Sequence, residues 1–281
     1  MFIYGFFFQS LCLKMCFPSK SKSVVALDRY ELLKDPINMD FMGDEGFYHA
    51  IALARQVKPS EGLQTFATVC STWVWISRSS TQRSPDNPLG NLKSKGVAKA
   101  NAMVTRMVLL ICFLASRFIG WVLEQPASSL MARHPRMLML QKLADTSPSL
   151  TGFYEVFTYM GAFGAETQKP TKLWSSEKWV RDLGRKVPAG FARNTKLETV
   201  TKNTRGGVSG GRDLKNTQAY PDGYGIALRD LWAANRTEEV PTHDIDMLSE
   251  DSNEFEEDSW EDADVSSLLE KKGVSTAHMP C

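Results

Sequence analysis

The chain has 281 residues, 43% of them hydrophobic, which is enough for one domain with a sizeable core and additional tails. Its formal net charge of +1 is the sum of two parts of opposite charge. Residues 237–281 hold fourteen acidic and two basic residues, and the first 236 residues carry a net charge of about +13. The five cysteines include no Cys-x-x-Cys pair, which argues against a disulfide framework or a cysteine-rich zinc site and indicates a reducing compartment, nuclear or cytoplasmic.

The N-terminal residues 1–22 are expected to be an apolar leader, which has neither the basic start nor the cleavage site of a secretion signal. The folded domain is expected over residues 23–235. Within it, helical spacing of apolar residues predicts a helix over Glu45–Val57 with Asp44 as its cap. A run of β-forming residues then predicts a strand over Gln64–Val69.

A polar loop over Ser71–Leu92 is expected next, followed by a helix over Val97–Arg117. The apolar run Met107–Ala115 inside this helix is far shorter than the about 20 residues that cross a bilayer, so no membrane span is expected. A buried strand is expected over Gly120–Glu124. The alternation of strand, helix and strand predicts an α/β domain with a parallel sheet.

The remainder of the domain is expected to contain strands over Phe153–Phe163 and Lys172–Trp174 and a short helix that reaches Leu183. Residues 184–215 are basic and rich in glycine, asparagine and threonine, which favours irregular structure. Residues 236–281 are acidic and contain too little apolar area to offset chain entropy, so this tail is expected to be disordered.

Two residues at the ends of predicted strands are candidates for chemistry. Cys70 opens the polar loop, and Glu124 ends the strand after it. Ligands of open α/β sheets bind outside the carboxyl ends of strands, where a thiol can serve as a nucleophile and a partly buried carboxyl group as an acid. Each residue also has a plainer interpretation, Cys70 as a small buried apolar residue and Glu124 as a solvated strand end. The four histidines have no partners at ligand spacing, so no metal site is expected.

Several segments resemble the cytosine-5 DNA methyltransferase family. Val69–Trp73 is similar to the loop that carries the nucleophile, and Glu124–Pro126 is similar to the Glu-Asn-Val tripeptide that carries the acid. Asp86–Gly90 resembles the stretch that connects them. Gly164–Lys169 resembles the glycine-to-glutamine motif beneath the catalytic loop, and Gln218–Gly225 resembles the late motif with glutamine, an aromatic residue, proline and aspartate.

A divergent set of uncharacterised proteins from algae and dinoflagellates is more similar still. The likeness covers roughly residues 23–232 and is carried by Cys70–Asn91, Val122–Arg136 and Met160–Gly164. It implies a Rossmann-like, methyltransferase-type parallel sheet, S-adenosylmethionine as the cofactor and DNA as the partner.

The resemblance also implies a mechanism and a cofactor site. The thiolate of Cys70 would add to carbon 6 of a cytosine flipped out of the duplex, and Glu124 would interact with ring nitrogen 3. Carbon 5 would then take the methyl group of S-adenosylmethionine. Glu31 and Asp40 match the acids that bind the ribose and the adenine of that cofactor.

The chain departs from the family pattern in the nucleophile loop, in the tripeptide and before residue 40. Val69 replaces the proline before the nucleophile, and Gln125 and Pro126 replace asparagine and valine. No Phe-x-Gly-x-Gly signature precedes residue 40, so we expect an N-terminally incomplete sheet and weak or no cofactor binding. Three hypotheses stay open: an active or degenerate enzyme of cytosine-5 methylation, a catalytically inactive nucleic-acid-binding remnant of a mobile element, and an interaction protein that acts through its acidic tail.

The acidic tail generates a prediction that does not depend on any family. Twelve basic and five acidic residues lie between Ala165 and Gln218, and a tethered acidic segment competes with phosphates for them at an effective concentration of order millimolar. Deleting residues 237–281 should therefore strengthen nonspecific binding to a DNA duplex at low salt and steepen its salt dependence. Fluorescence anisotropy from about 50 to about 200 mM salt measures both quantities. Equal affinities of the two chains over that range would contradict the prediction.

Overall fold

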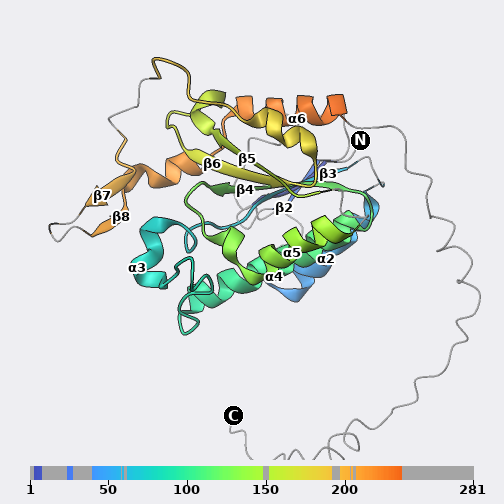
Figure 1. Ribbon diagram of the computed structural model, residues 1–281, viewed down its shortest axis with the longest axis horizontal. Coiled ribbons are helices and arrows are strands. Elements are labelled where there is room, and N and C mark those ends of the chain that lie inside the picture. Colours follow the sequence, from blue (N-terminus) through green and yellow to red (C-terminus); the bar gives the residue numbers. More distant parts are fainter. Residues whose placement is uncertain are drawn as a thin grey trace, which may run out of the picture. The chain divides into compact units, whose positions relative to one another are not determined.

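The fold is mixed α/β, a six-stranded sheet with helices on both of its faces (Figure 1). This computed structural model describes residues 3–7, 24–27, 40–57, 59, 62–147, 152–191, 197–202, 204 and 207–235. Side chains are not described for the first two of these segments, nor for Lys215, Asn216 and Gln218. The acidic tail expected over 236–281 lies outside the described residues.

The sheet has the strand order β2-β1-β3-β4-β6-β5. Its strands are β1 (Ile3–Phe7), β2 (Val24–Leu27), β3 (Leu63–Ala67), β4 (Gly120–Pro126), β5 (Tyr154–Tyr159) and β6 (Pro170–Ser175). β1 pairs in parallel with β2 and β3, and β3 pairs in parallel with β4, whereas β6 is antiparallel to both β4 and β5. The strand order reverses between β1 and β3, and open α/β sheets bind ligands outside the carboxyl ends of strands at such a point.

The expectation of a parallel sheet is wrong for β6. Only ten residues, Met160–Lys169, join β5 to β6, fewer than the dozen or more that a parallel crossover requires, so the two strands pair antiparallel. β6 then enters the sheet beside β4 in the antiparallel direction as well, with Lys172 opposite Gln125. The sheet is therefore mixed.

The N-terminus also differs from the expectation of a leader over residues 1–22 and an incomplete sheet. Ile3–Phe7 forms β1, which lies between β2 and β3. Isoleucine, tyrosine and phenylalanine favour extended structure. An apolar leader has the same composition, so the sequence pattern alone did not distinguish the two.

Three helices cover one face of the sheet (Figure 1): α2 (Asp44–Gln56), α4 (Lys95–Ala115) and α5 (Pro135–Thr146). Their buried side chains pack in one cluster with Trp121 and Leu123 of β4. Within the described part of the chain, α4 is the one helix that is long and apolar enough to cross a membrane by length and composition. Half of that stretch is buried, and here α4 packs as a core helix of the sheet.

The opposite face carries α6 (Asp222–Asn235), which the sequence analysis did not expect. Its Tyr224, Leu228 and Trp232 pack with Val122 of β4 in a second cluster. Successive residues of a strand point to opposite faces, so Glu124 shares this face with Val122. The smaller elements are η1 (Trp75–Ser77), α3 (Arg78–Thr81), η2 (Met131–Arg133), η3 (Met160–Phe163), η4 (Lys178–Leu183), β7 (Val200–Lys202), β8 (Val208–Gly210) and η5 (Arg212–Gln218).

The polar loop after Cys70 is held by the buried guanidinium group of Arg83. This group stacks on the ring of Trp73, with 3.4 Å from Cζ to the ring centroid, and donates hydrogen bonds to Asn101 Oδ1 at 3.0 Å and to the carbonyl oxygen of Pro88. Burial lowers the pKa of Arg83 to about 10, which still leaves it protonated at neutral pH. The segment expected to be a long loop is therefore fixed to the core.

His134 starts α5 from a buried position. Its Nδ1 accepts a hydrogen bond from the backbone N–H of Arg136 at 3.2 Å, and its ring meets Trp73 edge to face with centroids 5.7 Å apart. Burial, and then the charges of Arg83 and Arg136, lower the pKa of His134 from 6.5 to about 4. The folded protein thus holds this imidazole neutral.

This lowered pKa makes folding stability depend on pH. The unfolded chain takes up a proton at an ordinary histidine pKa, so the contribution of His134 is complete above pH 6.5 and falls as the pH drops towards 4. His134→Asn keeps a helix-capping acceptor and removes the titrating group. We expect the variant to lose less unfolding free energy than the wild type between about pH 7 and about pH 5, as measured by urea denaturation. An equal loss in both proteins would contradict this account.

Candidate functional site

Cys70 and Glu124 lie at the same edge of the sheet, as the sequence predicts. β3 and β4 pair in parallel with Phe66 opposite Leu123, so Glu124 follows at the carboxyl edge. Cys70 comes three residues after β3 ends at Ala67. The charge of Glu124 acts on the Cys70 thiol and raises its pKa.

The carboxylate of Glu124 is buried and paired with two residues from distant segments. Its side chain lies on the α6 face of the sheet, and the residue is 7% exposed. Its Oε2 accepts a hydrogen bond from the hydroxyl of Tyr220, and its Oε1 lies 3.7 Å from Nζ of Lys169 without a hydrogen bond of its own. Lys169 Nζ also lies 4.5 Å from the ring centroid of Tyr220. The three side chains therefore form one buried polar cluster.

Tyr220 is held in place by Tyr224 on the first turn of α6. Both rings are buried and stack with centroids 5.6 Å apart. Burial, and then the charge of Glu124, raises the pKa of both phenols well above their usual value. Tyr220 therefore keeps its proton and acts as a hydrogen-bond donor to Glu124.

Lys169 reaches Glu124 from an unusual backbone conformation. Its φ of 33° lies in the left-handed region, which is costly for a residue with a side chain. Backbone hydrogen bonds from Met160 to Lys169 and from Gly161 to Gln168, both 3.2 Å, hold the turn, and Gly164 allows it with a φ of 99°. The segment that resembles the family's glycine-to-glutamine motif thus directs a cation towards the candidate acid.

The thiol of Cys70 is not activated in this arrangement. Burial and the charge of Glu124 raise its pKa to about 11, and the charge of Lys169 opposes this. A thiolate is the reactive form of cysteine, so Cys70 needs a base before it can act as a nucleophile. Glu124 is the carboxylate whose charge acts on this thiol.

Gln125 ties the end of β4 to the residues that lead to Cys70. Its side chain lies on the opposite face from Glu124, where Nε2 donates to the carbonyl oxygen of Thr68 at 2.9 Å and to Thr68 Oγ1 at 3.1 Å. Ser129 Oγ donates to Gln125 Oε1 at 3.1 Å. The glutamine that stands where the family has asparagine is therefore a positioning residue for the segment before Cys70.

Of the two acids expected to bind a cofactor, Asp40 is the one that lies among the described residues. Glu31 lies outside the described residues. Asp40 accepts a hydrogen bond from the backbone N–H of Met42 at 3.0 Å and lies 4.0 Å from Nζ of Lys99, so its carboxylate is engaged in the turn before α2. Within the described segments, no group of three or more histidine, cysteine, aspartate or glutamate residues could hold a metal ion.

The roles of Lys169 and Tyr220 were missed by sequence reasoning. Both residues belong to segments that resemble family motifs, but nothing in the sequence indicated that their side chains meet Glu124. No family model, curated protein or solved structure matches this chain. The family resemblance therefore stays a prediction.

The opposed charges around Cys70 predict opposite shifts of its thiol pKa. Glu124→Gln should lower the pKa below about 11, because it removes the negative charge that raises it. Lys169→Gln should raise the pKa, because it removes the cation that stabilises the thiolate. The rate of alkylation of the Cys70 peptide, followed by mass spectrometry as a function of pH, measures this value.

Glu155→Gln is the matched control, because Glu155 lies two strands away from Glu124 on the other face of the sheet. It should leave the Cys70 pKa unchanged. Shifts of the same sign in the Glu124 and Lys169 variants would show that altered burial, not charge, sets the pKa.

Proposed function

We propose that this chain is a cytosine-5 DNA methyltransferase-like protein that acts in the nucleus or cytoplasm, with Cys70 as the nucleophile and Glu124 as the acid. One observation carries the proposal: the buried carboxylate of Glu124 is held by Tyr220 and Lys169 at a point where its charge reaches the Cys70 thiol. A thiol and a carboxyl group at the same carboxyl edge of a sheet are the two groups that addition to a cytosine ring requires.

The sheet supports the same proposal. The parallel strands β2, β1, β3 and β4 reverse their order between β1 and β3, as in doubly wound α/β folds that bind ligands at the switch point. Cys70 follows the strand on one side of this point. We therefore infer a Rossmann-like arrangement, with a nucleic-acid substrate approaching the edge of the sheet that carries Cys70 and Glu124.

These two residues account for every proton and electron pair that moves in the addition step. The Cys70 thiol passes its proton to the Glu124 carboxylate, and Sγ forms a bond to carbon 6 of the cytosine. The electron pair of the 5,6 double bond moves towards ring nitrogen 3, to which Glu124 delivers the proton. Tyr220 and Lys169 hold the Glu124 carboxylate in place during the transfer. S-adenosylmethionine, when bound, would supply the methyl group for carbon 5.

A second function is favoured by the pKa of Cys70. At a value of about 11, roughly one molecule in 10⁴ carries the thiolate at pH 7. A protein with so little of its nucleophile in the reactive form fits a catalytically inactive nucleic-acid-binding remnant of a mobile element. The two functions differ in whether Glu124 removes the thiol proton when a cytosine is bound.

Release of tritium from DNA that carries the label at carbon 5 of cytosine separates these functions. Reversible addition of Cys70 to carbon 6 makes carbon 5 exchange its hydrogen with water, and it needs no methyl donor. We expect release by the wild type, none by Cys70→Ser, and a rate about 10²- to 10⁴-fold lower for Glu124→Gln. Cys112→Ser, which changes the other partly buried free cysteine among the described residues, should behave like the wild type. A wild-type protein that binds the DNA but releases no tritium would overturn the enzyme proposal and favour the inactive remnant.

A further inference from the structure

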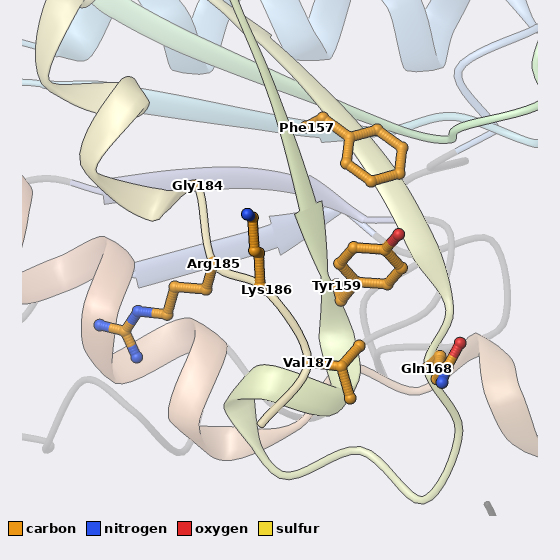
Figure 2. A pocket seen from close by; sticks show the side chains of 7 residues that line it. All are labelled: Phe157, Tyr159, Gln168, Gly184, Arg185, Lys186 and Val187. Atoms are coloured by element: carbon orange, nitrogen blue, oxygen red, sulfur yellow. The ribbon is translucent and has the colours of Figure 1, made fainter. Parts of the chain in front are cut away.

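A hollow of about 540 Å³ lies beside the edge strand β5 (Figure 2). Phe157 and Tyr159 of β5 line it, together with Gln168 and the segment 184–187 that follows η4. None of the residues that pair with Glu124 contributes to it. The hollow is therefore distinct from the site around Cys70.

Two aromatic rings form the apolar wall of the hollow. Phe157 and Tyr159 are alternate residues of β5, so both rings lie on one face of the strand, with centroids 5.1 Å apart and planes at 85°. Phe157 is 44% exposed. Phe157 pairs with Lys172 of β6, and Lys172 pairs with Gln125 of β4, so these three side chains share one face of the sheet. Gln125 is the neighbour of Glu124 in β4, so the two rings lie on the opposite face from Glu124. Exposed rings of this kind bind flat ligands by stacking.

The polar groups of the hollow are a cation, an amide and a phenol. Among the residues that the structure describes, Lys186 has no ion-pair partner. The side chains of Gln168 and Tyr159 have no hydrogen-bond partner among them either. None of the lining residues is acidic. Arg185 lies along the wall, but its guanidinium group points away from the two rings (Figure 2) and packs on Phe163, with 4.6 Å from Cζ to the ring centroid.

We propose that this hollow binds an unpaired nucleotide of a nucleic-acid strand. Its lining offers stacking surface for a base, an amide that can pair with the edge of that base, and a positive charge for its phosphate. A base within a duplex is covered on both faces by its neighbours, so the bound nucleotide must be single-stranded. The proposal does not depend on the chemistry of Cys70 and assigns a second nucleic-acid contact to the chain.

Fluorescence anisotropy with a labelled single-stranded oligonucleotide tests the proposal on the full chain. Phe157→Leu keeps an apolar side chain but removes the stacking ring, and we expect it to weaken binding about tenfold. Lys186→Gln should weaken binding less and reduce the slope of log affinity against log salt by about 0.7, the value of one phosphate contact with a single strand. Tyr48→Leu is the matched control, because Tyr48 is an exposed aromatic residue on α2.

The proposal predicts wild-type affinity for Tyr48→Leu and for Cys70→Ser, and weaker binding of a duplex than of the single strand. A free mononucleotide should compete for the same site more weakly than the strand, because it makes only one of the strand's contacts. Unchanged affinity of Phe157→Leu for the single strand would overturn the proposal, as would an equal loss in Tyr48→Leu. Loss of tritium release in Cys70→Ser with single-strand binding intact would separate this site from the proposed catalytic one.

Discussion

The pairing of the buried Glu124 carboxylate is the interaction on which the candidate site depends. A carboxylate removed from water is stable only with charged or hydrogen-bonding partners, and removing one partner of a buried pair typically costs about 3–5 kcal/mol. Here the partners are Lys169 and Tyr220. Because β6 is antiparallel to β4, its first residue lies beside the end of β4, and Lys169 reaches the carboxyl edge of the sheet. The antiparallel direction of β6 therefore places Lys169 next to Glu124.

The same carboxylate decides what Cys70 can do. Burial, and then the charge of Glu124, keeps the Cys70 thiol protonated, and in the proposed reaction the same carboxylate removes the thiol proton. The partners of Glu124 influence this balance, since the charge of Lys169 lowers the pKa of the Cys70 thiol and Tyr220 keeps its own proton. An active enzyme and an inactive remnant would share this geometry and differ in where the proton lies when a cytosine is bound. The hollow beside β5 contributes to neither state, because neither Cys70 nor Glu124 nor the partners of Glu124 line it.

The sequence predicted the local elements around the site better than it predicted the sheet. β3, α4 and β4 lie within about two residues of the predicted ranges, because runs of β-forming or apolar residues mark these segments in the sequence. The direction of β6 depends on its connection to β5 and on its partner strands, which a pattern of residue types does not contain. α5 did have a signal, because Pro135 follows its capping residue His134. The contact of Glu124 with Tyr220, 96 residues later, could come only from the tertiary structure.

Covalent trapping on DNA is the most direct measurement of the central claim, that Cys70 and Glu124 form a site for addition to cytosine. In a duplex that contains 5-fluorocytosine, the fluorine cannot leave carbon 5 after methyl transfer. A nucleophile that has added to carbon 6 therefore stays bound to the base. In the presence of S-adenosylmethionine, the account predicts a protein–DNA adduct whose mass maps to the Cys70 peptide and which is absent in Cys70→Ser. A wild-type protein that binds this DNA together with S-adenosylmethionine and forms no adduct, or forms one at another cysteine, would contradict it.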